Sequence, residues 1–152
     1  MSTADQEPKA VVFHYDEQKL DSGKSWVGLG SAGMVKASVQ FLKQGGDNNL
    51  HAHSNEDEVF LVLSGRVRFY GKGDKLIAEL GTREGIVIPR MFAYWFESVG
   101  DDQLELYKVG AYDPSMKNDR VNFEGIRESQ VTRGDTHTLT GRPPTGEELA
   151  KA

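Results

Sequence analysis

Hydrophobic and polar residues alternate along much of the chain with a period of two, and short Gly-rich breaks separate the alternating runs. Residues two apart share one face of a β-strand, so this period is typical of strands that bury one face. Ser64 and Gly65 separate two such runs at the spacing of a two-residue hairpin. The pattern predicts an all-β sandwich or barrel, with strands over residues 10–15, 35–42, 58–63, 66–70, 76–80, 85–88, 92–98 and 103–109.

The alternation fades after residue 110, where the sequence becomes polar and rich in Gly and Pro. We therefore expect a single domain made of an N-terminal arm (1–32), a barrel (33–110) and a C-terminal extension (111–152). The extension has isolated apolar residues without a sustained period, so it wraps the barrel, crosses to a partner subunit or is partly disordered.

Composition excludes several kinds of chemistry. The 152 residues contain no Cys, which rules out disulfides, thiolate metal sites and a cysteine nucleophile. A net charge of −5 without a Lys/Arg run argues against a nucleic-acid partner. No apolar stretch approaches the ~20 residues that span a bilayer, and the polar N-terminus does not resemble a signal peptide. We expect a cytoplasmic protein with no membrane partner.

Two of the four histidines, His51 and His53, are separated by one residue and would share a face of an extended strand. Glu58 begins the next alternating run, which places its carboxylate at the edge of an apolar interior. Two neutral imidazoles and one carboxylate make a facial set for a divalent first-row metal. Taken alone, His51 and His53 read equally well as loop residues in an acidic, solvated stretch.

The wider spacing decides between these readings, because it resembles the first motif of the cupin family, carried by Gly45, His51, His53, Glu58 and Gly65. The second cupin motif is matched at Gly85, Pro89 and Phe96. Two residues depart from it. Met91 stands where a turn Gly is usual, and Tyr94 stands where the fourth metal ligand, a His, is expected.

The resemblance covers residues 35–109 and implies a double-stranded β-helix (jelly-roll) barrel. It also implies one divalent metal ion, with iron favoured over Mn, Ni, Zn or Co, held by His51, His53, Glu58 and Tyr94. The role of Tyr94 stays open among a phenolate ligand, a hydrogen-bonding acid/base and a core aromatic.

Three functions are consistent with this site. A non-haem metal dioxygenase would act on a small chelating organic substrate, phenolic or rich in oxygen. A metal-dependent isomerase, lyase or dehydratase would use Tyr94 and Glu58 as catalytic groups, with Tyr94 as acid/base. A binding module would hold a ligand or metal without catalysis. The resemblance favours an enzyme, and the dioxygenase is the leading hypothesis.

Strand phase selects the expected walls of a substrate pocket, which are Val39, Phe41, Phe60, Val62, Phe69, Phe92, Phe96 and Leu106. If Glu58 faces inward, then Val59, Leu61 and Leu63 face outward and need a cover, so we expect a homodimer. The stretch from Gly28 to Gly33 matches a dinucleotide fingerprint, but the strand-like run that follows it favours a Gly-rich entrance loop. His14 and His137 are expected to be bystanders.

Overall fold

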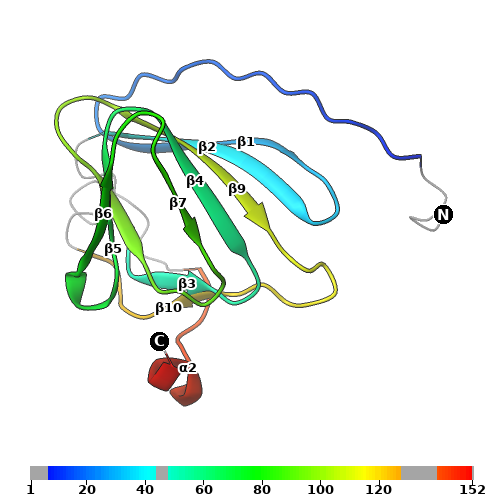
Figure 1. The fold of residues 1–152 in the computed structure, drawn as a ribbon, viewed down its shortest axis with the longest axis vertical. Helices are drawn as coiled ribbons and strands as arrows, with labels where there is room; N and C mark the ends of the chain where they lie inside the picture. Colours follow the sequence, from blue (N-terminus) through cyan, green and yellow to red (C-terminus); the bar gives the residue numbers. More distant parts are fainter. Residues whose placement is uncertain (1–6, 44–47, 128–139, 152) are drawn as a thin grey trace.

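The computed structural model describes residues 7–43, 48–127 and 140–151. Its larger sheet has five antiparallel strands (Figure 1). In spatial order they are β1 (Gly23–Ser31), β2 (Val35–Lys43), β9 (Leu104–Ala111), β4 (Asp57–Ser64) and β7 (Gly85–Ile88).

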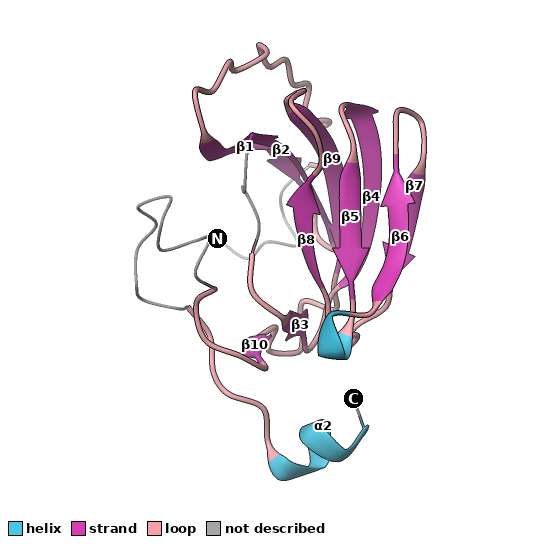
Figure 2. Cartoon of the chain, turned by 90° about the vertical axis from the view of Figure 1, so that its left-hand side faces the viewer, coloured by secondary structure: helices cyan, strands magenta, loops and turns pink. Residues whose placement is uncertain are grey.

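A second layer faces this sheet (Figure 2). It consists of β6 (Leu76–Leu80), β5 (Val67–Tyr70) and β8 (Trp95–Ser98), and a short sheet of β10 (Arg120–Asn122) and β3 (His51–His53) lies beside it. An isolated antiparallel bridge between His51 and Tyr94 connects the short sheet to the start of β8. The helical segments among the described residues are η2 (Lys72–Asp74) and α2 (Gly146–Lys151).

The two layers meet over an apolar core. Phe60 and Val62 of β4 point inward beside Leu106 of β9, and they meet Phe69 and Phe96 from the opposite layer. The Phe60 and Phe69 ring centroids are 5.2 Å apart. Alternating burial along β4 has the predicted phase, and the all-β jelly-roll prediction is confirmed.

The N-terminal region differs from the expectation. The predicted strand at 10–15 has no regular structure, and the described arm runs across the molecule and past its edge (Figure 1). The stretch from Gly28 to Gly30, expected to be a loop, belongs to β1, and the register with β2 shifts between these two glycines. A bulge explains how a Gly-rich segment pairs as a strand.

Three of the residues predicted to line the substrate pocket do not lie in the barrel interior. Val39 and Phe41 lie on the opposite face of β2, where they pack with Leu29 under Tyr15 and Leu20 of the arm. The phase was wrong because the arm covers the outer face of β2, so the apolar face packs there, and Leu42 is the residue that enters the main core. Phe92 precedes β8 and is 42% exposed.

The other five assigned positions do face the interior, but they are packed core. Phe60, Val62, Phe69, Phe96 and Leu106 are all buried against one another. They support the site and do not line an open pocket among themselves.

The C-terminal extension packs on the barrel in its described parts. Val121 of β10 pairs with Ala52 of β3, and Arg142 bridges to Val121. The Arg142 guanidinium also donates to Asp119 at 2.9 Å and to Glu148 at 2.7 Å, which ties α2 to this sheet. Gly45 and His137 lie outside the described residues. In the described part of the chain, no helix is long and apolar enough to cross a membrane.

Candidate functional site

The two histidines of β3 lie together at one end of the barrel. Backbone hydrogen bonds in both directions, 3.0 and 2.9 Å long, hold His51 against Tyr94. The His51 and His53 ring centroids are 5.1 Å apart, so the two imidazoles lie next to each other, as the spacing predicts. His51 is buried, and the side chain of His53 is 14% exposed.

Both imidazoles are held neutral. Burial, followed by the charge of Arg120, lowers the pKa of His51 well below its usual value. Nδ1 of His51 lies 2.7 Å from the Asn49 carbonyl oxygen, so Nδ1–H donates there and Nε2 keeps its lone pair. Burial also lowers the pKa of His53, although Glu58 opposes the shift.

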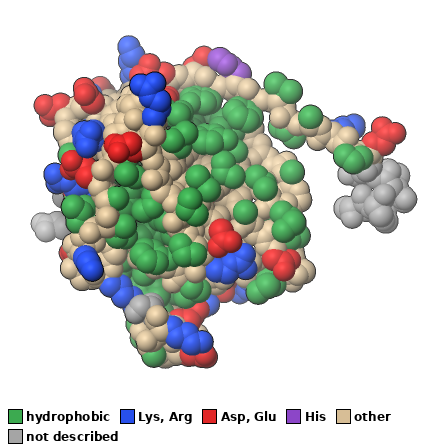
Figure 3. Space-filling model, in the orientation of Figure 1, with side chains coloured by type: hydrophobic (Ala, Val, Ile, Leu, Met, Phe, Trp, Pro, Cys, Tyr) green, Lys and Arg blue, Asp and Glu red, His purple; other side chains and the backbone are tan. Residues whose placement is uncertain are grey.

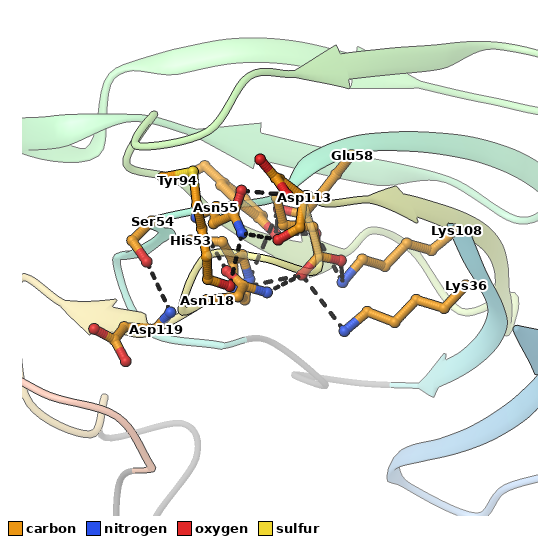
Figure 4. A network of polar contacts seen from close by, with 12 residues as sticks. Lys36, His53, Ser54, Asn55, Glu58, Tyr94, Lys108, Asp113, Asn118 and Asp119 are labelled. Atoms are coloured by element: carbon orange, nitrogen blue, oxygen red, sulfur yellow. Dashed lines mark hydrogen bonds and ion pairs between the residues drawn. The ribbon is translucent and has the colours of Figure 1, made fainter. Parts of the chain in front are cut away.

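Glu58 is the centre of the site. The Tyr94 hydroxyl donates to both of its carboxylate oxygens, at 2.9 and 3.0 Å, and Nζ of Lys108 lies 2.7 Å from Oε2 (Figure 4). Nε2 of His53 is 3.7 Å from Oε1. A carboxylate that is only 1% exposed is thus surrounded by a phenol, an ammonium and an imidazole.

Tyr94 is a protonated phenol in this arrangement. Burial raises its pKa well above the usual value, and the charge of Glu58 and the hydrogen bond to it raise the pKa further. The Tyr94 hydroxyl proton is directed at Glu58, as in a hydrogen-bonding group, and its ring packs in the main core, as in a core aromatic.

A second buried carboxylate, Glu56, lies beside the first. Asn118 donates to its Oε2 at 2.9 Å, and the ammonium groups of Lys36 and Lys108 are each 3.6 Å from a carboxylate oxygen. Burial raises the pKa of Glu56, but Lys108, Asn118, His53 and Lys36 together lower it below its usual value. The acidic stretch from Glu56 to Glu58 resembles a solvated loop, so no sequence signal separated Glu56 from its neighbours.

The C-terminal extension contributes to the same site. Asn118 holds Glu56, and the Arg120 guanidinium donates to the side-chain oxygens of Asn49, at 2.5 Å, and Asn122, at 3.2 Å. Burial lowers the pKa of Arg120, and the charge of Glu58 opposes that shift. No sequence motif marks Asn118 or Arg120 as site residues. The pairing of β10 with β3 brings them to the site.

The side chains at the site match only part of the ligand set for the metal that the cupin resemblance implies. The two neutral imidazoles suit a divalent cation. The third donor does not fit, because Glu58 is already paired with Lys108 and hydrogen-bonded to a protonated Tyr94. In residues 7–43, 48–127 and 140–151, no three His, Asp or Glu side chains are arranged to hold a metal ion.

Met91 keeps the backbone path that a turn glycine would allow. Its φ is +63°, in the left-handed region, and its N–H donates to the His53 carbonyl at 2.7 Å. This bond fixes the end of β3, so the departure from the second motif costs local strain and preserves the position of His53.

The comparisons with known proteins agree with the fold. A family model for the cupins matches residues 23–128, so the chain belongs to the cupin family. No curated protein matches the sequence.

Solved structures share the architecture at low sequence identity. An RmlC-like cupin from Desulfovibrio desulfuricans is 19% identical with a TM-score of 0.52, covering 64% of this chain and 97% of the other. KdgF from Halomonas is 17% identical with a TM-score of 0.57, covering 72% and 100%. An RmlC-like cupin from Methanocaldococcus jannaschii is 14% identical with a TM-score of 0.58, covering 72% and 96%. At this identity the likeness concerns the fold alone.

Replacing Met91 with Gly should stabilise the protein. Relief of the left-handed conformation is worth about 1 kcal/mol, and a higher denaturant midpoint with unchanged slope would measure it. The matched control is Met34→Gly, at an exposed position outside the positive-φ residues, where greater freedom of the unfolded chain should lower stability. Equal losses in both variants would show that residue 91 carries no backbone strain.

Proposed function

We propose that this cupin is an acid/base enzyme that isomerises, dehydrates or cleaves a small organic substrate. The observation that carries the proposal is the buried pair of Tyr94 and Glu58, which joins a proton donor and a proton acceptor by a hydrogen bond of 2.9 Å. Such pairs with opposing proton affinities are common in active sites.

Each group has a distinct part in the proposed proton transfer. Glu58 accepts a proton from a substrate carbon, since a carboxylate has about four lone-pair directions and Tyr94 and Lys108 occupy only part of them. Tyr94 delivers a proton to the leaving or receiving atom of the substrate. The proton on Glu58 then returns to the Tyr94 oxygen along their hydrogen bond, so the pair ends in its starting state.

Two neighbours support this chemistry. Lys108 offsets the charge of Glu58 at 2.7 Å and keeps the carboxylate in place. His53, the more exposed of the two histidines, connects the buried carboxylate to the outside through a neutral ring. Its Nε2 can take up a proton and release it again, so the ring is charged only while it holds that proton.

A second candidate is the metal-dependent dioxygenase. Support comes from the two adjacent neutral imidazoles, one of them oriented by the Asn49 carbonyl in the way that ligating histidines commonly are. For a metal bound by His51 and His53, Glu58 would have to give up its ion pair with Lys108 and bind the cation instead. The acid/base reaction described above does not depend on a metal.

We also propose that the chain forms a homodimer through the outer face of the larger sheet. Val59, Leu61 and Leu63 of β4 and Val87 of β7 are exposed on this face, where hydrophobic side chains gather (Figure 3). A monomer rarely leaves an apolar sheet face uncovered. A second copy offers the same face, which suits a two-fold interface.

Tyr94→Phe tests the acid/base proposal. Solvent deuterium entering carbon-bound positions of 2-oxo and hydroxy carboxylates, followed by NMR, should slow by about 10²- to 10⁴-fold, because the proton donor is lost. Tyr107→Phe is the control, since Tyr107 packs in the cluster of the opposite sheet face. Exchange that is equally fast in Tyr94→Phe and wild type would refute the role of Tyr94.

Lys108→Met separates the two candidate functions. Removal of the ammonium frees Glu58 Oε2, so this variant should bind Mn²⁺ or Zn²⁺ more tightly than wild type, measured by metal content and by calorimetry. For the acid/base proposal, chelator-treated wild type keeps its deuterium exchange. Stoichiometric iron in wild type, lost in His51→Ala together with oxygen consumption, would establish the dioxygenase instead.

The dimer proposal predicts a light-scattering mass of twice 16.8 kDa for wild type. The double variant Val59→Lys, Val87→Lys should shift the mass to one chain, because two like charges per subunit would face each other. Met116→Lys, at an exposed hydrophobic outside this face, should stay dimeric. A single-chain mass for wild type at micromolar concentration contradicts the dimer.

A further inference from the structure

A pocket of about 400 Å³ opens beside the site, between β1 and the neighbouring strands β2 and β9. Its walls combine the backbone of two glycines of β1 with two lysines. The lining residues are Trp26, Gly28, Gly30, Ser31, Lys36, Ala37, Ser38, Lys108 and Gly110. The pocket therefore reaches from the surface to the same Lys108 that contacts Glu58.

Positive charge exceeds negative charge around this pocket and the site behind it. Lys36 and Lys108 run side by side, with their ammonium groups directed toward the buried carboxylates (Figure 4). Arg120 is paired with amide oxygens of Asn49 and Asn122. These three cations stand against Glu56 and Glu58, which leaves one positive charge, carried by Arg120 behind the pocket. An anion entering here would balance the charge.

Glu56 offers a specific contact to such a ligand. It is only 2% exposed, yet its Oε1 has no hydrogen-bond donor. A Cβ atom at Gly110, one of the pocket residues, would collide with this oxygen. The bare backbone of Gly110 thus leaves this oxygen next to a pocket residue, with Nζ of Lys108 at 3.6 Å but no hydrogen-bond donor, and a buried acceptor without a donor costs free energy until one arrives.

We propose that the pocket binds a small hydroxycarboxylate, whose carboxylate lies between Lys36 and Lys108 and whose hydroxyl donates to Oε1 of Glu56. The inference rests on the proposed function, for which it names the substrate class. It places the ligand against Lys108, and through Lys108 next to the proton-transfer pair of Glu58 and Tyr94.

The charges around the pocket favour a hydroxycarboxylate over other small ligands. An amino acid would bring an ammonium group and restore the excess of positive charge, whereas a hydroxyl supplies the donor without adding charge. Inorganic phosphate matches the lysines and carries a P–OH donor, but its further negative charge and acceptor oxygens would lie against the Glu56 carboxylate. Neutral polyols lack the anion that the two lysines favour.

The experiment compares ligands that differ by one hydroxyl group. Binding of malate against succinate, and of lactate against propionate, is measured by calorimetry or ligand-observed NMR, with phosphate and glycerol as further probes. We expect each hydroxycarboxylate to bind wild type at least about fivefold more tightly than its partner, from the added hydrogen bond. Affinity should fall with added salt.

Two variants locate the contacts. Lys36→Met should weaken malate binding about tenfold, whereas Lys43→Met, on the same strand but outside the pocket, should not. Glu56→Gln should reduce the preference for malate over succinate, because a neutral amide oxygen is a weaker acceptor than a carboxylate oxygen. Circular dichroism and thermal melting verify that each variant is folded.

The outcomes separate this proposal from the acid/base function. If Tyr94→Phe abolishes deuterium exchange but still binds malate, both stand, and if no variant affects exchange while Lys36→Met loses binding, only the pocket proposal stands. Equal binding of malate and succinate to wild type, tighter binding of phosphate or glycerol, or unchanged binding by Lys36→Met would each overturn the hydroxycarboxylate assignment.

Discussion

Burial of the Glu58 carboxylate is the constraint around which the site is built. A carboxylate inside an apolar barrel is costly unless it is paired and hydrogen-bonded. Tyr94 and Lys108 meet this need from two different layers, one from the start of β8 and the other from β9. Removing Lys108 would leave a buried charge unbalanced, which typically costs about 3–5 kcal/mol for an ion pair, and removing the Tyr94 hydroxyl would take away a hydrogen bond to that charge. The same contacts therefore hold the layers together and bring a proton donor to a proton acceptor.

The second carboxylate extends this logic to the end of the chain. Glu56 needs a donor from Asn118 and the approach of Lys36 and Lys108, and Gly110 supplies the space that its side chain occupies. Asn118 reaches Glu56 because β10, which follows the barrel strands along the chain, pairs with β3. The extension is part of the site's electrostatics as well as a cover, and its pairing determines how much positive charge surrounds the two histidines.

The sequence predicted the fold and part of the site for identifiable reasons. Alternation along β4 placed Phe60 and Val62 inside, and the spacing of His51 and His53 placed two imidazoles together. The phase of β2 misled, because the arm covers its outer face and Val39 is as buried as Leu42. β1 was missed because Gly lowers strand propensity, although a bulge accommodates it. Glu56, Lys108 and Arg120 were missed because long-range pairing, rather than a local motif, brings them together.

The two departures from the second cupin motif have opposite consequences. Met91 adopts the left-handed conformation of the glycine it replaces, so the backbone path and the position of His53 are kept. Tyr94 keeps its place beside His51 but changes the chemistry, because a neutral imidazole presents a lone pair to a cation and a phenol presents a proton to a carboxylate. With Lys108 already close to Glu58, this single exchange replaces a lone pair directed at a cation by a proton directed at an anion, which is the basis of the acid/base proposal.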